Sequence, residues 1–268
     1  MSAQPPADVP AGARLREALR HDGGVSTPRI EAVAEEAAVA LVYDGHPFAV
    51  MMASPADLAD FALGFSLTEG VIETADECLA IEIVEAARGF EARLRLAEGR
   101  GLALRARTRA LAGRTGCGLC GVETIAEALR PVARPVSAAR LSAAALSAAV
   151  EVFPAGQILA AATGATHAAA FADSDGRIRT LREDVGRHNA LDKLIGALAR
   201  AGVDPGSGFV VVSSRCSYEM VHKTAAAGCP AIVALSAPTG LAVDLAEKLG
   251  VGLAAFARDG RFTVYAGE

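Results

Sequence analysis

Several features that direct a protein to membranes or to secretion are missing from this sequence. Its 268 residues include no tryptophan, and aromatic residues make up only 4%. No run of about twenty residues is apolar and free of charges, so no membrane-spanning helix is expected. The first ten residues lack the basic and apolar segments of a secretory signal. The sequence therefore predicts a cytoplasmic protein that does not enter a membrane.

An excess of positive charge is missing as well. The chain has 26 Lys and Arg residues against 31 Asp and Glu residues, which gives a formal net charge of −5. A protein that binds nucleic acid usually presents a strong positive field to the phosphates, and no such overall field is available here. We expect no nucleic-acid partner, and any anionic ligand has to be held by a local basic site.

Cysteine is scarce, yet two of the five cysteines stand close together. An odd number without a regular framework suits a reducing compartment rather than a disulfide scaffold. Cys117 and Cys120 lie in the loop Gly116-Cys117-Gly118-Leu119-Cys120-Gly121. Its glycines leave the backbone bare, so a large reactant can approach the sulfur atoms. The helical pattern that begins at Val122, together with Arg114, favours the thiolate form.

A single C-x-x-C motif allows three interpretations. A zinc site would need two more ligands, and the pair Cys216 and Cys229 is spaced unlike a second C-x-x-C. A thioredoxin-like dithiol has the right spacing, but that motif normally follows the first strand, and here more than a hundred residues precede it. The third interpretation is a nucleophilic thiol that carries sulfur as a persulfide, with the second thiol as helper or resolver. The motif alone leaves all three open.

The first half of the chain predicts an α+β subdomain with antiparallel strands. Residues 1–28 are rich in Ala, Pro, Gly and charge, and we interpret them as a mobile tail. The subdomain proper is placed at residues 29–138, up to the cysteine loop and its helix. A helix capped by Ser54 and ended by Gly70 is expected between strands. The predicted strands cover residues 39–43, 48–52, 79–84, 90–96 and 102–107.

The second half, residues 139–268, predicts an α/β layer. Helical patterns at residues 141–153 and 155–162 are interrupted by Pro154. Short apolar runs then alternate with amphipathic helices, a pattern typical of buried strands in a largely parallel sheet. The apolar runs are residues 168–171, 209–212, 231–235 and 252–256, and the helical faces are centred on residues 191–198 and 241–249.

Polar residues follow several of these predicted strands. Ligands of α/β sheets bind outside the carboxyl ends of the strands, so these loops are candidate ligand sites. Arg215, Arg258 and Arg261, together with two helix N-termini, would form a basin for phosphate groups. His188 stands at a helix start among charges and is a candidate site residue, whereas His167 is interpreted as structural.

Four motifs in order resemble the formate dehydrogenase accessory sulfurtransferase family (FdhD). The resemblance covers nearly the whole chain beyond the tail and is far more specific than a C-x-x-C alone. The motifs are Gly116-Cys117-Gly118-Leu119-Cys120-Gly121, Glu183-Asp184-Val185-Gly186-Arg187-His188-Asn189-Ala190-Leu191-Asp192-Lys193, Ser217-Tyr218-Glu219-Met220-Val221 and Phe256-Ala257-Arg258-Asp259-Gly260-Arg261.

The resemblance implies a sulfur carrier of the cytoplasm that forms homodimers. Such a protein takes sulfur from a cysteine desulfurase and delivers it to the metal, molybdenum or tungsten, of the bis(molybdopterin guanine dinucleotide) cofactor of formate dehydrogenase. By resemblance, Cys117 holds the persulfide, and Cys120 is the second thiol. The guanine dinucleotide segment maps onto Phe256, Ala257, Arg258, Asp259, Gly260 and Arg261. The resemblance also implies a cytidine-deaminase-like fold for the second half and no metal bound by the protein itself.

Two further classes of function remain to be weighed. A non-catalytic chaperone would bind the same cofactor and dock to formate dehydrogenase while its cysteines serve only structure. A zinc deaminase of the same fold is disfavoured because Ala168 and Ala169 follow His167 where the H-x-E carboxylate is required, and no P-C-x-x-C is present. Cys216 stands where we expect another residue type in the family, and we interpret it as an idle core residue.

Overall fold

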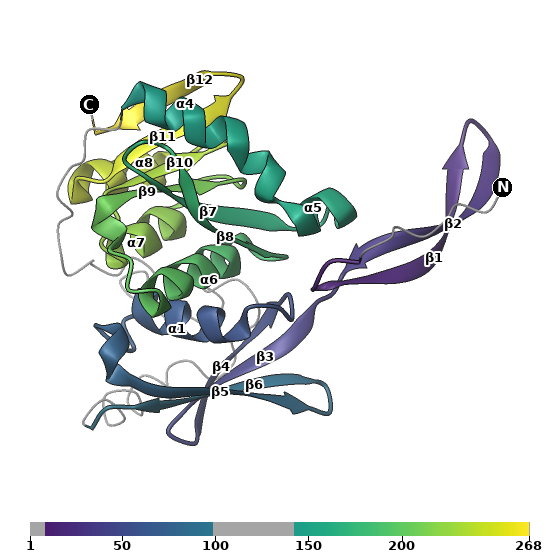
Figure 1. Ribbon diagram of the computed structural model, residues 1–268, viewed down its shortest axis with the longest axis horizontal. Coiled ribbons are helices and arrows are strands. Elements are labelled where there is room, and N and C mark those ends of the chain that lie inside the picture. Colours follow the sequence, from purple (N-terminus) through teal and green to yellow (C-terminus); the bar gives the residue numbers. More distant parts are fainter. Residues whose placement is uncertain (1–8, 99–141, 268) are drawn as a thin grey trace.

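Two sheets with helices between them form the body of the protein. The computed structural model describes residues 9–98 and 142–267. A four-stranded sheet lies at one end, followed by helix α1, a layer of helices, and a six-stranded sheet covered on its far side by α4 (Figure 1). None of the described helices combines the length and apolarity needed to cross a lipid bilayer.

The N-terminal sheet has the strand order β4-β3-β6-β5. All its neighbours are antiparallel except β3 and β6, which run parallel. Helix α1 covers one face, where Phe61 is fully buried against strand side chains such as Leu41 and Leu94. The sequence expectations for these strands and for the end of the helix near Gly70 are confirmed. The elements are β3 (Ala37–Tyr43), β4 (His46–Ala53), α1 (Leu58–Thr68), η1 (Ala75–Glu77), β5 (Cys78–Ala86) and β6 (Gly89–Leu96).

Ser54 does not cap α1, which corrects the sequence prediction. The helix begins at Leu58, and its N-cap is Asp57, a residue with a left-handed backbone conformation and φ of 53°. Ser54 is fully buried, and its polar groups bind the other half of the chain. Its N–H donates to Asp184, and its hydroxyl oxygen accepts from the N–H of Val185. The hydroxyl is therefore not available to the helix.

The C-terminal sheet has the order β12-β11-β10-β9-β7-β8 and is mixed rather than largely parallel. Only β9, β10 and β11 run parallel. The tight turns between β7 and β8 and between β11 and β12 make antiparallel hairpins, and a hairpin reverses the chain direction. Besides helix α6, the elements are α4 (Ala143–Val152), η2 (Phe153–Gly156), α5 (Ile158–Thr163), β7 (His167–Asp173), β8 (Ile178–Asp184), η3 (Pro205–Ser207), β9 (Gly208–Val212), α7 (Tyr218–Ala226), β10 (Ala231–Ala234), α8 (Gly240–Leu249), β11 (Gly252–Arg258) and β12 (Arg261–Ala266).

The N-terminal region contains a long β-ribbon where a mobile tail was expected. β1 (Ala13–Asp22) pairs with β2 (Val25–Ala34) along its whole length, and the ribbon projects from the body (Figure 1). Gly23 and Gly24 join the strands with φ of 54° and 86°, the positive values that a two-residue hairpin requires. This glycine pair was the sequence signal that the composition of residues 1–28 obscured. The predicted boundary between residues 138 and 139 and the strand at residues 102–107 lie outside the described residues.

Helices α1 and α6 (Arg187–Arg200) approach so closely that their backbones are in contact. A Cβ atom placed on Gly64 would lie 1.8 Å from the carbonyl oxygen of Asp192, and one on Gly196 would lie 1.9 Å from that of Asp60. No side chain fits in either position, because the opposing atoms belong to the rigid backbone. The two glycines therefore set the distance between the halves of the molecule.

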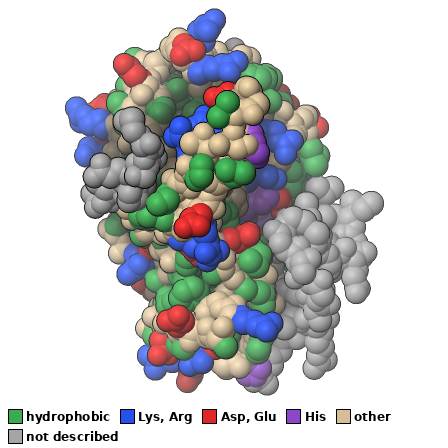
Figure 2. Space-filling model, turned by 90° about the vertical axis from the view of Figure 1, so that its right-hand side faces the viewer, with side chains coloured by type: hydrophobic (Ala, Val, Ile, Leu, Met, Phe, Trp, Pro, Cys, Tyr) green, Lys and Arg blue, Asp and Glu red, His purple; other side chains and the backbone are tan. Residues whose placement is uncertain are grey.

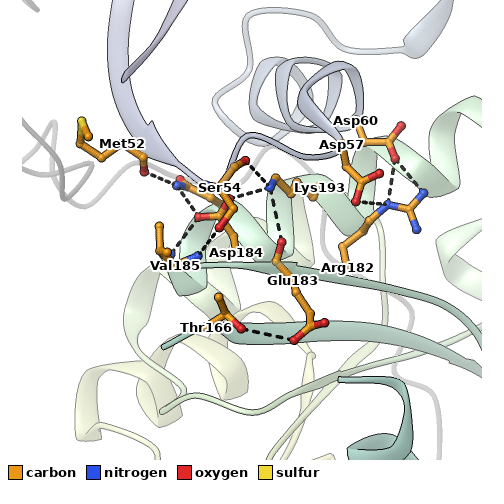
Figure 3. A network of polar contacts seen from close by, with 12 residues as sticks. Met52, Ser54, Asp57, Asp60, Thr166, Arg182, Glu183, Asp184, Val185 and Lys193 are labelled. Carbon is orange, nitrogen blue, oxygen red and sulfur yellow. Dashed lines mark hydrogen bonds and ion pairs between the residues drawn. The ribbon is translucent and has the colours of Figure 1, made fainter. Parts of the chain in front are cut away.

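Ion pairs surround this helix contact (Figure 3). Lys193 Nζ lies 2.7 Å from Asp184 Oδ2, and both side chains are fully buried. The same ammonium donates to the carbonyl oxygen of Ser54 at 3.0 Å. At the other end of the contact, Asp60 accepts from Arg182 at 2.8 Å and from Arg200 at 2.6 Å. Residues far apart in the sequence are thus joined by ion pairs whose carboxylates are buried.

We predict that Gly196→Ala destabilises the protein strongly. The added methyl group would overlap the backbone of α1, so the helices must separate, and overpacking of this kind costs about 1–3 kcal/mol. Urea unfolding followed by circular dichroism measures the free energy of unfolding. Gly240→Ala is the matched control, because Gly240 begins α8 and a Cβ added there would have nothing within 4 Å. A Gly196→Ala protein as stable as the control would contradict the close helix contact.

We further predict that Lys193→Met lowers the free energy of unfolding by roughly 3–5 kcal/mol, the usual cost of leaving one member of a buried ion pair alone. The carboxylate of Asp184 would remain buried without its cation. Arg177→Met is the control, since Arg177 pairs with Asp175 on the surface, where both side chains are about 70% exposed. Equal losses of stability in the two variants would refute the structural role of Lys193.

Candidate functional site

One edge of the six-stranded sheet collects the polar segments predicted from the sequence. β8, β9, β10 and β11 all end at this edge, and β7 begins there because it runs opposite to β8 and β9. The segments 185–186, 213–217 and 235–239 follow these strands. Adjacent strands are about 4.8 Å apart, so the edge from β8 to β11 is roughly 19 Å long. Such an edge is where α/β sheets bind ligands.

Backbone hydrogen bonds hold the loops of this edge in fixed positions. The N–H of Cys216 donates to Ala237, and the N–H of Thr239 donates to the carbonyl of Cys216, at 3.1 and 3.0 Å. The N–H of Phe256 donates to Ser236 at 3.1 Å. The loops after β9 and β10 and the last part of β11 are therefore linked to one another. A ligand at this edge would meet a preformed surface.

The predicted dinucleotide segment, Phe256–Arg261, ends β11, forms the turn and begins β12. Phe256 has a φ of 54° in an irregularity of the strand pairing, and its ring is 43% exposed. The next residue, Ala257, is fully buried, while Asp259 and Gly260 form the tight turn with φ of 53° and 70°. The segment thus presents an aromatic ring with the exposed guanidinium groups of Arg258 and Arg261 nearby.

A second basic group lies at the other end of the edge, around the start of α6. His167 pairs with Asp184 across β7 and β8, close to Arg187 and His188. Burial lowers the pKa of His167, and the charges of Arg187 and His188 lower it further, so its imidazole is neutral near pH 7. His188 Nε2 lies 2.8 Å from Glu219 Oε2, which joins the N-termini of α6 and α7. This contact has the distance of an ion pair but lacks the angle of a hydrogen bond.

Besides His188 Nε2, two buried polar atoms at these helix starts have no hydrogen-bond partner among the described residues. They are Arg187 Nε and the hydroxyl oxygen of Ser217. Neither Gly186 nor Ser217, the N-cap residues of α6 and α7, caps its helix with a side chain. Buried polar groups are normally paired, so these donors suit an acceptor supplied by a ligand. The sequence patterns did not single out Arg187 or Ser217, although both lie within the motifs.

A cavity of about 320 Å³ lies between the two halves, next to the start of α6. Met51, Met52 and Phe65 form apolar walls, and the polar lining includes four carboxylates, the ammonium of Lys223 and the imidazole of His188. The carboxylates are Glu36, Glu69, Asp192 and Glu219. This lining does not suit a phosphate group. An anion would bind along the sheet edge and not in the cavity.

Lys223 is committed to the carboxylates of this cavity. Its ammonium lies 3.0 Å from both oxygens of Asp192 and 3.1 Å from Glu69. Burial alone would lower the pKa of Lys223, but the two carboxylates outweigh burial and hold it above the usual value. The lysine is therefore a structural cation that connects α7 with α1 and α6. The motif that ends with Asp192 and Lys193 is accordingly structural at that end and faces the site at Arg187 and His188.

The cysteines of the described residues have inert surroundings. Cys216 and Cys229 are almost completely buried, and burial raises the pKa of each thiol to about 12. Burial also raises the pKa of the half-buried Cys78. A thiol with a raised pKa is a poor nucleophile at neutral pH. This supports the interpretation of Cys216 as idle. Cys117 and Cys120 lie outside the described residues.

In residues 9–98 and 142–267 there is no group of three or more His, Cys, Asp or Glu side chains placed to hold a metal ion. What this part of the chain offers is a binding surface: backbone N–H groups at helix starts, guanidinium groups, and an exposed aromatic ring. These groups can hold and orient an anionic nucleotide.

Known proteins share both the sequence and the fold. A model described as the FdhD/NarQ family matches residues 34–268. The sulfur carrier protein FdhD of Bordetella petrii is 50% identical over 249 residues, covering 92% of this chain and 90% of that protein. The protein of the same name from Xanthomonas campestris pv. campestris is 48% identical over 265 residues, covering 99% and 94%.

The crystal structure of a formate dehydrogenase accessory protein from Desulfotalea psychrophila is similar in fold. Its TM-score is 0.75, with 24% identity over 95% of this chain and 96% of the other. The mixed α/β architecture is therefore shared, while the cytidine-deaminase-like detail stays a prediction. Since the family model covers most of the chain and the relatives are about half identical over more than nine tenths of it, the chain belongs to the FdhD/NarQ family.

Proposed function

We propose that this protein is a sulfur carrier, a sulfurtransferase that accepts persulfide sulfur from a cysteine desulfurase on Cys117. It would deliver that sulfur to the bis(molybdopterin guanine dinucleotide) cofactor required by formate dehydrogenase. The observation that carries the proposal is the near 50% identity to proteins named sulfur carrier protein FdhD, together with the Cys117-Gly118-Leu119-Cys120 motif. We further propose that it acts in the cytoplasm as a homodimer.

The surroundings of the other cysteines support the assignment to this motif. Cys216 and Cys229 are buried with thiol pKa values raised to about 12, so neither forms a thiolate at neutral pH. The pKa of Cys78 is shifted in the same direction. The nucleophilic thiol has to be sought in Cys117 and Cys120, which stand among glycines next to Arg114.

The proposed sulfur transfer needs no external oxidant, because the thiol pair supplies the electrons that reduce the transferred sulfur. The Cys117 thiolate attacks the outer sulfur of the desulfurase persulfide, the S–S bond breaks, and the desulfurase cysteine leaves as a thiolate. The Cys120 thiolate then attacks Sγ of Cys117 and expels the outer sulfur as hydrosulfide toward the metal of the substrate cofactor. Two electrons from the thiol pair reduce that sulfur, which leaves a Cys117–Cys120 disulfide to be reduced by a cellular thiol.

Binding of the guanine dinucleotide is proposed for the segment 256–261. The exposed ring of Phe256 offers a surface for stacking a base, and Arg258 and Arg261 would neutralise phosphate groups. A backbone hydrogen bond from the N–H of Phe256 to Ser236 joins this segment to the loop after β10 and helps to hold it in position. The acid-lined cavity is left out of this proposal because its carboxylates would repel phosphate.

We predict that the purified protein gains one sulfur atom on Cys117 after incubation with a cysteine desulfurase and cysteine. Intact-protein mass spectrometry with peptide mapping measures the gain, and dithiothreitol should remove it. Cys117→Ala should abolish the gain, whereas the control Cys216→Ala should keep it, because Cys216 is buried with a raised pKa.

The same measurement separates the carrier from a chaperone. If neither loop cysteine acquires sulfur while guanine nucleotide still binds, and Cys117→Ala still supports formate dehydrogenase activity, the protein acts as a non-catalytic cofactor chaperone. Sulfur on Cys216 or Cys229 would contradict the structural assignment.

We predict that Arg258→Ala combined with Arg261→Ala weakens the binding of GDP about a hundredfold or more, since each lost charge-assisted hydrogen bond costs about 1.5–3 kcal/mol. Isothermal titration calorimetry with GDP as the probe measures the dissociation constant. Arg177→Ala is the control, because it removes an exposed arginine from the β7–β8 turn at the opposite edge of the sheet. An unchanged GDP affinity in the double variant would place the nucleotide site elsewhere.

A further inference from the structure

The β1–β2 ribbon extends from the body without forming part of either large sheet. Its strands are ten residues long and pair along their whole length (Figure 1). Helix α5 contacts both strands of the ribbon, and at the ribbon's base a Cβ on Gly12 would lie 3.3 Å from the side chain of Leu159 in α5. Figure 2, which views the molecule from the side of the ribbon, shows apolar side chains among charged ones on this face.

The register gives the ribbon two different faces. One face has a single carboxylate, Glu17, among mainly apolar side chains. Its members are Ala13, Leu15, Glu17, Leu19, His21, Ser26, Pro28, Ile30, Ala32 and Ala34. The other face carries four arginines and two acids: Arg14, Arg16, Ala18, Arg20, Asp22, Val25, Thr27, Arg29, Glu31 and Val33.

The apolar face is exposed in the single chain. Leu15, Leu19 and Ile30 are 36%, 55% and 41% exposed. A two-stranded hairpin is at best marginally stable in water unless something covers one of its faces. Large apolar side chains gathered on a projecting strand pair also favour aggregation. The apolar face of a ribbon of this length therefore has to pack against another protein surface whenever the protein is folded.

We propose that the apolar face of the ribbon docks on the body of a second copy of this chain, and that the contact is reciprocal. This inference rests on the homodimer of the proposed function and names the element that forms it. The body carries exposed apolar side chains that such a dimer would cover. Val152 at the end of α4 and Ile158 at the start of α5 are 52% and 65% exposed.

The size of the contact favours a second copy over a different protein. One face of the ribbon has ten residues, whereas a stable interface usually takes about 20–30 residues from each side. In a two-fold dimer each chain contributes its own ribbon and also receives the ribbon of its partner, so the contact is made twice. With both contacts counted, each chain contributes about 20 residues, which is the usual size of a stable interface. A single ribbon on an unrelated protein would make about half of it.

The ribbon also lies outside the part of the chain that the family model describes. That model begins at residue 34, where β2 ends. None of the described residues of the sheet edge belongs to the ribbon. Dimer formation through the ribbon is accordingly separable from nucleotide binding, and variants of the ribbon leave the groups of the sheet edge intact.

Sedimentation equilibrium of the full chain, over a range of concentrations, tests the proposal. We expect a dimer for the unaltered protein and a monomer for Leu19→Glu combined with Ile30→Glu, which places two charges on the apolar face. Ala18→Glu combined with Thr27→Glu is the matched control, because it adds the same charges to the opposite face of the same strands. The control should remain a dimer.

A second double variant, with less disruptive substitutions, distinguishes loss of the dimer from loss of folding. Leu19→Ser with Ile30→Thr removes apolar contact while keeping side chains compatible with a strand, and should raise the dimer dissociation constant at least about tenfold. Circular dichroism verifies that each variant is folded. A dimer that both apolar-face variants leave unchanged would overturn the role of the ribbon alone. An unaltered protein that sediments as a monomer would overturn the homodimer too, and sulfur loading of Cys117 on the same samples tests the sulfur chemistry separately.

Discussion

The structure depends on the backbone contact between α1 and α6. Gly64 and Gly196 face the opposing carbonyl oxygens at distances that exclude any side chain. Such a contact brings the buried ammonium of Lys193 within reach of Ser54 and Asp184, and so joins the N-terminal sheet to the C-terminal one. Because one chain segment supplies the glycine and the other supplies the backbone it touches, neither half can hold this geometry by itself.

The same contact positions the candidate site. Helix α6 carries Gly196 and Lys193 in its middle and Arg187 and His188 at its start, so fixing the helix against α1 also fixes its N-terminus at the sheet edge. The motif from Glu183 to Lys193 therefore has two roles. Its later residues bind the two halves together through buried charges, and its earlier residues present cationic groups next to α7.

Electrostatics divide the surface near the site into regions with different uses. The cavity between the halves is lined by four carboxylates and contains an ammonium already paired with them. The sheet edge instead offers exposed guanidinium groups at Arg258 and Arg261 and, among the described residues, buried donors without partners at Arg187 and Ser217. Cys216 lies in a loop of the sheet edge, but burial keeps its side chain, like that of Cys229, in the thiol form. Binding and sulfur chemistry are thus expected on different parts of the chain.

The sequence by itself determined the elements and the family. Its apolar periodicity and turn glycines predicted most of the strands and the ends of helices, because those signals act within a few residues. The segment 256–261 was assigned through the resemblance of its motif to the family. Cys117 and Cys120 stay predictions from the motif. Only the tertiary structure decided the mixed sheet, the ribbon of residues 13–34, and the partner of Ser54, which a local pattern had made a helix cap. These features depend on contacts between residues as far apart as Ser54 and Asp184, and local sequence patterns contain no information on which distant group will satisfy a hydrogen bond or cover an apolar face.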